Sequence, residues 1–122
     1  MRAVNNDLGG ALPPSVIEFV QAHVRSLLSW DIIMFLVRNP DAVLDIEGLA
    51  ERLGRREEEI ETEVAGLAGS GLLISHGGLV RLSGSEPMRQ AAQEFAYACE
   101  DRSERLSLIA IVLKRLSEEA LG

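Results

Sequence analysis

The sequence predicts a mainly α-helical fold with a small β-hairpin and a long C-terminal helix. Three observations predict it. Apolar residues recur at helical spacing over most of the 122-residue chain, two short apolar runs flank a glycine-containing turn at residues 75–78, and no glycine or proline interrupts residues 88–121. Helical spacing of apolar residues marks amphipathic helices, and a short glycine-containing turn between apolar runs marks a hairpin.

The composition agrees with packed helices. Hydrophobic residues make up 47% of the chain and aromatic residues only 4%, so leucine, isoleucine, valine and alanine must build the core. The length is that of one domain, and a chain of this size removes roughly two thirds of its unfolded surface from water. The sequence therefore predicts one globular core rather than a disordered chain.

The N-terminal half is expected to start with two helices. Pro14 or Ser15 opens a first helix that runs to about Leu28, with an apolar stripe along one side. Ser29 is expected to be the N-cap of a second helix, Trp30–Arg38, because serine accepts hydrogen bonds from the first free backbone N–H groups. This second helix has almost no polar face, so we expect it in the centre of the domain.

The middle of the chain predicts helix, tight turn, helix and hairpin. A one-rung strand is expected at residues 43–44, Asp45 caps a third helix at Ile46–Leu53, and Gly54 ends that helix in a left-handed conformation. A fourth helix begins at Arg55 or Arg56 and ends at residues 69–71. Its inward residues are Ile60, Val64, Leu67 and Ala68, and the hairpin strands are expected at 72–74 and 79–82.

The C-terminal segment, residues 85–122, carries the most regular pattern. Its apolar positions alternate at spacings of four and three, which is a heptad seam typical of helices that pair. We expect one long helix, or two helices with a bend near residues 100–103. The seam consists of Met88, Ala92, Phe95, Cys99, Arg102, Leu106, Ile109, Leu113, Leu116 and Ala120.

Residues 45–82 resemble a known superfamily. A helix ending in Leu53-Gly54 is followed by a second helix with three inward apolar residues and then by Gly71-Leu72-Leu73. Over about residues 30–83 this pattern resembles the winged helix-turn-helix superfamily, as in MarR-like and PadR-like transcription regulators. The resemblance implies a winged-helix domain with its N-terminal helix at 13–84 and a C-terminal dimerisation segment at 85–122. Residues 1–12 are expected to be a flexible N-terminus, because glycine and proline pairs at 9–10 and 13–14 punctuate the start of the chain.

The resemblance also implies a function. Such proteins are dimeric transcription regulators that place the fourth helix in the DNA major groove. Here Arg55, Arg56 and Arg81 would touch phosphates, and Thr62 would be the base-edge contact. In PadR-like regulators a helix after the wing dimerises, and the corresponding homodimer interface would comprise Met88, Phe95, Cys99, Arg102, Leu106, Ile109, Leu113 and Leu116. The other interpretation packs this seam on the first helix of the same chain.

The charge disfavours DNA as the partner. The chain carries a formal charge of −7, and residues 45–63 hold eight acids and three arginines, a balance of −5. DNA-binding surfaces gain much of their affinity by neutralising phosphates, which carboxylates repel. The alternative is a protein–protein interaction module on a winged-helix scaffold that has lost DNA binding, with the acidic helix docking a basic protein. The plain interpretation of these acids is a solvated helix face.

No pattern in the sequence predicts catalysis. The two histidines, His23 and His76, are far apart in sequence, and no cluster of three or four metal ligands is visible. Cys99, the single cysteine, lies on the seam as a small hydrophobe and favours a reducing compartment. Residues 1–12 do not look like a signal peptide, and the longest apolar run, 32–37, is too short to span a bilayer. We expect a cytoplasmic protein that is no enzyme and uses no cofactor, metal or membrane.

Overall fold

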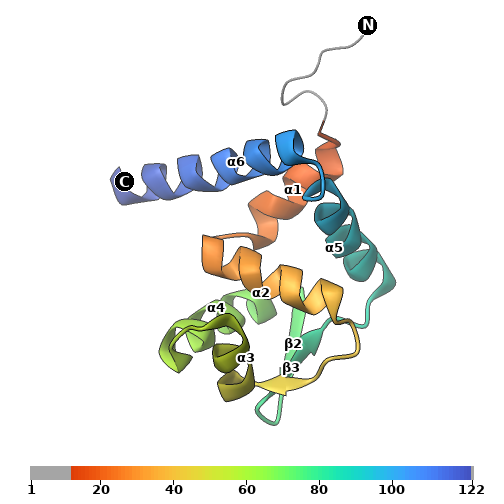
Figure 1. Ribbon diagram of the computed structural model, residues 1–122, viewed down its shortest axis with the longest axis vertical. Helices are drawn as coiled ribbons and strands as arrows, with labels where there is room; N and C mark the ends of the chain where they lie inside the picture. Colours follow the sequence, from red (N-terminus) through yellow and green to blue (C-terminus); the bar gives the residue numbers. More distant parts are fainter. Residues whose placement is uncertain (1–11, 122) are drawn as a thin grey trace, which may run out of the picture.

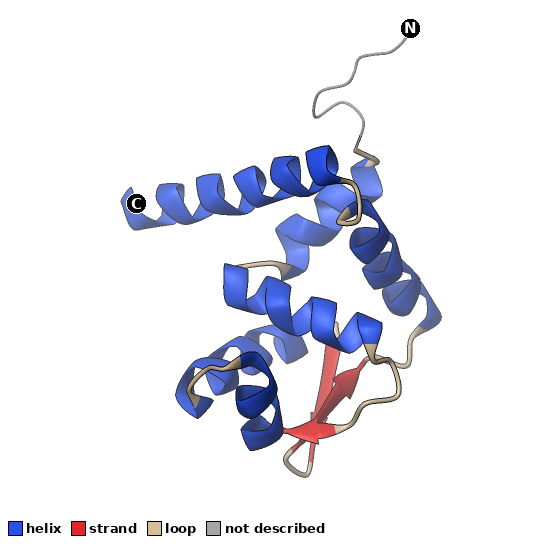
Figure 2. Ribbon diagram, in the orientation of Figure 1, coloured by secondary structure: helices blue, strands red, loops and turns tan. Residues whose placement is uncertain are grey.

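The computed structural model describes residues 12–121, which form six helices around a small sheet (Figures 1 and 2). The predicted mainly helical fold with a small β-sheet is confirmed. In chain order the elements are α1 (Pro14–His23), α2 (Leu27–Arg38), β1 (Leu44–Asp45), α3 (Ile46–Leu53), α4 (Glu57–Gly69), β2 (Leu73–His76), β3 (Leu79–Leu82), α5 (Glu86–Ala98) and α6 (Arg102–Leu121).

The sheet has three antiparallel strands in the order β1-β3-β2. Strands β2 and β3 form the predicted hairpin, whose two-residue loop is Gly77-Gly78 with φ of 59° and 82°. Two successive residues with positive φ are what a tight hairpin loop of this twist requires, and glycine adopts that conformation without strain. Val80 and Leu82 on β3 are buried, whereas Leu79 and Arg81 point to the other side and are exposed. The hairpin therefore covers the core with one face only.

The corner between α3 and α4 forms as the sequence predicts. The Asp45 carboxylate accepts a hydrogen bond from the Gly48 backbone N–H at 2.7 Å, and Gly54 has a φ of 67°. Beyond the corner, Ile60, Val64 and Leu67 on α4 are 0%, 3% and 2% exposed. One face of α4 therefore packs against α2, α3 and β2, and its opposite face remains in solvent.

The junction between α1 and α2 differs from the prediction. Helix α1 ends at His23, not near Leu28, and the N-cap of α2 is Ser26, whose Oγ accepts from the Ser29 N–H at 3.0 Å. Ser29 occupies the third helical position and forms the reciprocal hydrogen bond, in which its Oγ accepts from the Ser26 N–H at 2.9 Å. This reciprocal capping box satisfies two free donors at once, which a cap at Ser29 alone would not do.

Helix α2 lies in the centre, as its apolar surface predicts. Ile32, Ile33 and Leu36 are at most 1% exposed, and α2 packs against α3, α4, α5 and β3. The Trp30 ring meets the Phe95 ring of α5 edge to face, with centroids 5.0 Å apart. The core therefore runs from the sheet through α2 to α5.

The C-terminal segment consists of two helices, so the expected arrangement with a bend near residues 100–103 is confirmed and one continuous helix is not formed. Helix α5 ends at Ala98, and the Asp101 carboxylate accepts from the Glu104 N–H at 2.9 Å at the start of α6. Asp101 thus acts as a local N-cap, which favours a new helix start over continuation. Helix α5 packs on α1 and α2, whereas α6 crosses α1 and projects beyond it at its C-terminal end (Figure 1).

Candidate functional site

The outer face of α4 carries carboxylates and lies beside α3. Glu57, Glu58 and Glu61 of α4 are exposed, and with Glu47 and Glu51 of α3 they line an open depression of about 1020 Å³. We call these five residues the acidic surface. Six glutamates and two arginines line the whole depression, which gives it a formal balance of −4. Negative charge near the N-terminus of a helix is also stabilised by the helix dipole.

The two arginines predicted to touch phosphates lie at the rim of this depression. Arg55 Nη1 is 3.5 Å from Glu59 Oε2, and Arg56 Nε is 3.8 Å from Glu59 Oε1. The same Glu59 Oε1 accepts from the Arg56 backbone N–H at 3.2 Å. Exposed pairs of this kind contribute little stability. They nevertheless hold both guanidinium groups beside a carboxylate that any phosphate would have to displace.

The structure separates the other two residues predicted to contact DNA. Thr62 is exposed on α4, and its Oγ1 already donates to the Glu58 carbonyl at 3.0 Å. Arg81 is exposed on β3 and lines a different depression, together with His76 and Leu79 of the hairpin. Arg55 and Arg56 therefore lie directly before the start of α4 and Thr62 lies on α4, and Arg81 is not brought to them.

The predicted dimer seam is divided by the break between α5 and α6. Phe95 and Cys99 are 0% and 4% exposed and lie in the core of this chain, and Met88 is half-buried against it. The part of the seam on α6 is open: Leu106 is 53% and Leu113 is 47% exposed. We call Arg102, Leu106, Ile109, Leu113 and Leu116 the α6 seam, of which Ile109 and Leu116 are half-buried.

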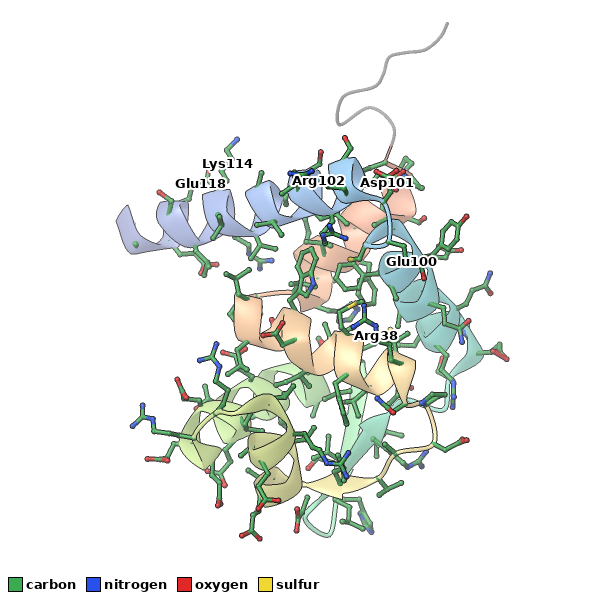
Figure 3. All side chains as sticks on the ribbon, viewed as in Figure 1. Arg38, Glu100, Asp101, Arg102, Lys114 and Glu118 are labelled. Carbon is green, nitrogen blue, oxygen red and sulfur yellow. The ribbon has the colours of Figure 1, made fainter. Side chains whose placement is uncertain are left out.

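Arg102, a residue of the predicted seam, has two acidic sequence neighbours, Glu100 and Asp101, at the break between α5 and α6. Within residues 12–121, no ion pair joins Arg102 to Glu100 or Asp101. Figure 3 shows these three residues around the α5–α6 junction, and it shows Lys114 and Glu118 further along α6, where both are exposed. Arg102 is exposed and has its charge available at the first turn of the α6 seam.

The two groups with shifted pKa values are structural. Burial lowers the pKa of His23, whose Nδ1 lies 2.7 Å from Ser70 Oγ and so joins α1 to the end of α4. Burial raises the pKa of the Cys99 thiol to about 11, although Arg105 and Arg38 act in the opposite direction. A thiol with such a pKa is a poor nucleophile, because the thiolate is the reactive form. Cys99 therefore acts as a core residue.

Two observations on the part of the chain that the structure describes concern metal ligands and membrane-length helices. Over residues 12–121, no three histidine, cysteine or acidic side chains are grouped so that they could hold a metal ion. No single helix in that range combines the length and apolarity needed to cross a membrane. Helices α1 and α2 meet that test only as a pair, and they are bent by 115° relative to each other.

Sequence reasoning missed a second depression, which lies where α1, α5 and α6 meet. Glu94 and Tyr97 of α5 line it together with Ser15 of α1 and Glu104 of α6. These residues are spread over 90 positions of the sequence and share no motif, so only the tertiary fold brings them together. Tyr97 lies on the exposed side of α5 and is 76% exposed. Because an aromatic residue on a helix surface is unusual, Tyr97 is the one residue of this depression that the sequence could have pointed to.

The chain was compared with protein-family models, with curated proteins and with solved structures, and none of them matches it.

Proposed function

We propose that this protein is a winged-helix regulator that acts by binding another macromolecule and catalyses no reaction itself. Its partner at the acidic surface is a basic protein segment, and a second copy of the chain binds along the α6 seam. The proposed setting is the cytoplasm, where the buried thiol of Cys99 stays reduced.

The order of the central elements supports a winged helix. After α2 come a short strand, two helices joined at a glycine corner, and a hairpin whose second strand pairs with the first strand. In this interpretation α3 and α4 are the helix-turn-helix, and β2 and β3 are the wing. Helix α4 is then the element that such a scaffold presents to its partner.

The acidic surface is the observation that carries the choice of partner. Ile60, Val64 and Leu67 fix α4 on the core, so its glutamates point outward and cannot turn away without breaking that packing. The depression that holds the acidic surface has a balance of −4, so it repels phosphates and attracts lysine and arginine side chains. Charge complementarity of this kind sets specificity and association rate more than final affinity. We therefore expect a basic partner whose binding weakens as salt rises.

A titration with a fluorescent lysine- and arginine-rich peptide tests this proposal. The triple variant Glu57→Gln, Glu58→Gln, Glu61→Gln removes charge from the acidic surface. The control triple variant Glu86→Gln, Glu100→Gln, Glu118→Gln removes the same charge from exposed positions elsewhere. We expect the first variant to weaken binding at least fivefold and the control to weaken it less than twofold. Equal losses in both variants would contradict a specific surface on α4.

The second candidate function is a DNA-binding transcription regulator. Three exposed guanidinium groups favour it. Arg55 and Arg56 lie at the N-terminal end of α4 and Arg81 lies on the hairpin, and both positions would contact phosphates on this scaffold. Breaking the pairs of Arg55 and Arg56 with Glu59 would free two cations. The four other glutamates on α4, however, would remain against the DNA.

Dimerisation through the α6 seam rests on its spacing and exposure. Leu106, Ile109, Leu113 and Leu116 follow the heptad alternation of three and four residues, and they lie beside the face that packs on α1. A helix of 20 residues with this stripe can pair with the same helix of a second copy. The exposed Arg102 would then lie at the end of the interface and help to set its register.

A further inference from the structure

The depression between α1, α5 and α6 has the size of a small-molecule site. Its volume is about 540 Å³, within the range of about 300–1,000 Å³ that is usual for ligand pockets. It draws side chains from three helices, including Ser15 and Val16 of α1, Tyr97 and Ala98 of α5 and Glu104 of α6. It shares no lining residue with the acidic surface of α4.

Its lining combines an apolar floor, an aromatic ring and two carboxylates. Val16 and Ala98 are 2% and 4% exposed, so only their outermost atoms form the floor. Tyr97 is exposed and belongs to the lining of the depression. Glu94 and Glu104 bring two negative charges, and the lining contains no lysine or arginine.

Among the described residues, no cation pairs with either carboxylate. Over residues 12–121, neither Glu94 nor Glu104 takes part in an ion pair. The contact of Glu94 with another side chain is a long one, in which Ser15 Oγ donates to Glu94 Oε1 at 3.4 Å. A depression with two unneutralised carboxylates and an aromatic face attracts a cation and repels an anion.

We propose that this depression binds a small organic cation, an ammonium or amidinium group attached to an apolar body. The charged group lies between Glu94, Glu104 and the Tyr97 ring, and the apolar body covers Val16 and Ala98. The proposal goes beyond the macromolecular partner proposed above, because it uses other residues on other helices. A ligand here touches α6 as well as α1 and α5, so it also stabilises the packing of α6 by mass action.

Calorimetric titration with three probes of similar size tests the proposal. The probes are 2-phenylethylammonium, the neutral 2-phenylethanol and the anion phenylacetate, which differ mainly in charge. We expect the ammonium to bind at least about tenfold more tightly than the alcohol, and phenylacetate not to bind. Equal binding of ammonium and alcohol, or no binding of the ammonium at millimolar concentration, would overturn the proposal.

Three single variants locate the site. Glu94→Gln and Tyr97→Leu change exposed lining positions, and each is expected to weaken ammonium binding about three- to tenfold without unfolding the protein. The control is Glu118→Gln, which removes the same charge from an exposed position further along α6 (Figure 3) and should change binding less than twofold.

Amide chemical-shift mapping supplies a readout that does not depend on the variants. Shifts at Ser15, Tyr97 and Glu104 are expected on titration with the ammonium. Shifts confined to α4 would show that the cation binds the acidic surface through charge alone, and would overturn the proposal. A loss with Glu118→Gln as large as that with Glu94→Gln would overturn it as well.

Discussion

Helices α5 and α6 carry the two halves of one heptad pattern and bury them to very different extents. Ala92 and Phe95 on α5 and Cys99 at its C-cap are 0%, 0% and 4% exposed, whereas on α6 Leu106 and Leu113 are 53% and 47% exposed. Helix α5 is held between α1 and α2, so its seam faces the core. The spacing of apolar residues therefore identifies a shared helix face, but the surrounding helices decide whether that face is core or surface.

The difference arises from how each helix meets α1. Helix α6 buries Leu108 and Val112 against the rest of the chain, and these two residues lie beside the seam rather than on it. The guanidinium of Arg115 also donates to the Gln21 carbonyl of α1, and Arg105 Nη1 donates to the Cys99 carbonyl at 2.7 Å. These contacts fix one side of α6 against the rest of the chain. Leu106 and Leu113 lie outside that contact and are exposed to solvent.

We expect the largest effect on stability from truncating a residue in the buried half of the heptad pattern. Phe95→Ala removes a ring that contacts Phe19 and Trp30, with centroids 5.1 Å and 5.0 Å away. We expect it to lower the free energy of unfolding by about 3–5 kcal/mol. Leu113→Ala is the matched change on the exposed half and should cost less than about 0.5 kcal/mol in dilute protein. Urea unfolding of both variants measures this contrast, and similar losses would show that α6 is core as well.

The exposed half is expected to matter for assembly instead. Leu106→Ser with Leu113→Ser removes the two most exposed apolar residues of the α6 seam from both copies of a dimer. We expect the dissociation constant of the dimer to rise about a hundredfold or more, with an unchanged helical circular dichroism signal. Light scattering across a dilution series measures it. A monomeric wild-type protein at high micromolar concentration would show that the seam joins no second copy.

Thiol reactivity sharpens the same comparison. Burial raises the pKa of Cys99 from 9.0 to about 11, which reduces its thiolate fraction at pH 8 about a hundredfold. A Cys99→Ala, Leu113→Cys variant moves the single thiol to the exposed half. We expect iodoacetamide to modify the new thiol at least a hundredfold faster than Cys99 in the native protein. If Cys99 reacted as fast as the new thiol, α5 would not be held against the core.

A smaller, pH-dependent effect is expected at His23, which ties α1 to the end of α4. Because burial lowers its folded-state pKa below 6.5, the folded state binds fewer protons than the unfolded state. The stability from His23 is therefore complete above pH 6.5 and is lost as the pH falls through the lowered pKa. His23→Gln should flatten that part of the stability–pH curve, as measured by thermal unfolding between pH 7.5 and 4.5. An unchanged slope would exclude His23 as its source.

Local signals predicted most of the central fold. Interactions between residues close in sequence determine the roles of Asp45, Gly54 and the stripe of Ile60, Val64 and Leu67. Spacing and residue type are therefore enough to infer these roles. The sequence assigned the cap of α2 wrongly to Ser29, because Ser26 and Ser29 are both capable caps and only the reciprocal hydrogen bonds decide between them. The break before α6 depends likewise on the side-chain hydrogen bond that Asp101 makes.

The candidate sites were predicted less completely. The helical spacing of the glutamates predicted the acidic face of α4. It did not predict that Arg55 and Arg56 both pair with Glu59. The depression that holds Glu94, Tyr97 and Glu104 depends on the angle at which α6 crosses α1, and no local pattern encodes that angle. Burial of Phe95 and Cys99 inside the chain is a tertiary result of the same kind.

A fluorescence anisotropy titration with random-sequence duplex DNA at low salt tests the central claim most directly. Because the depression that holds the acidic surface has a balance of −4, we predict no binding by the wild-type protein at micromolar concentration, even at low salt, where charges are least screened. Binding that is tight at low salt and weakens steeply as salt rises would contradict the claim. It would make α4 and the hairpin a DNA-reading surface.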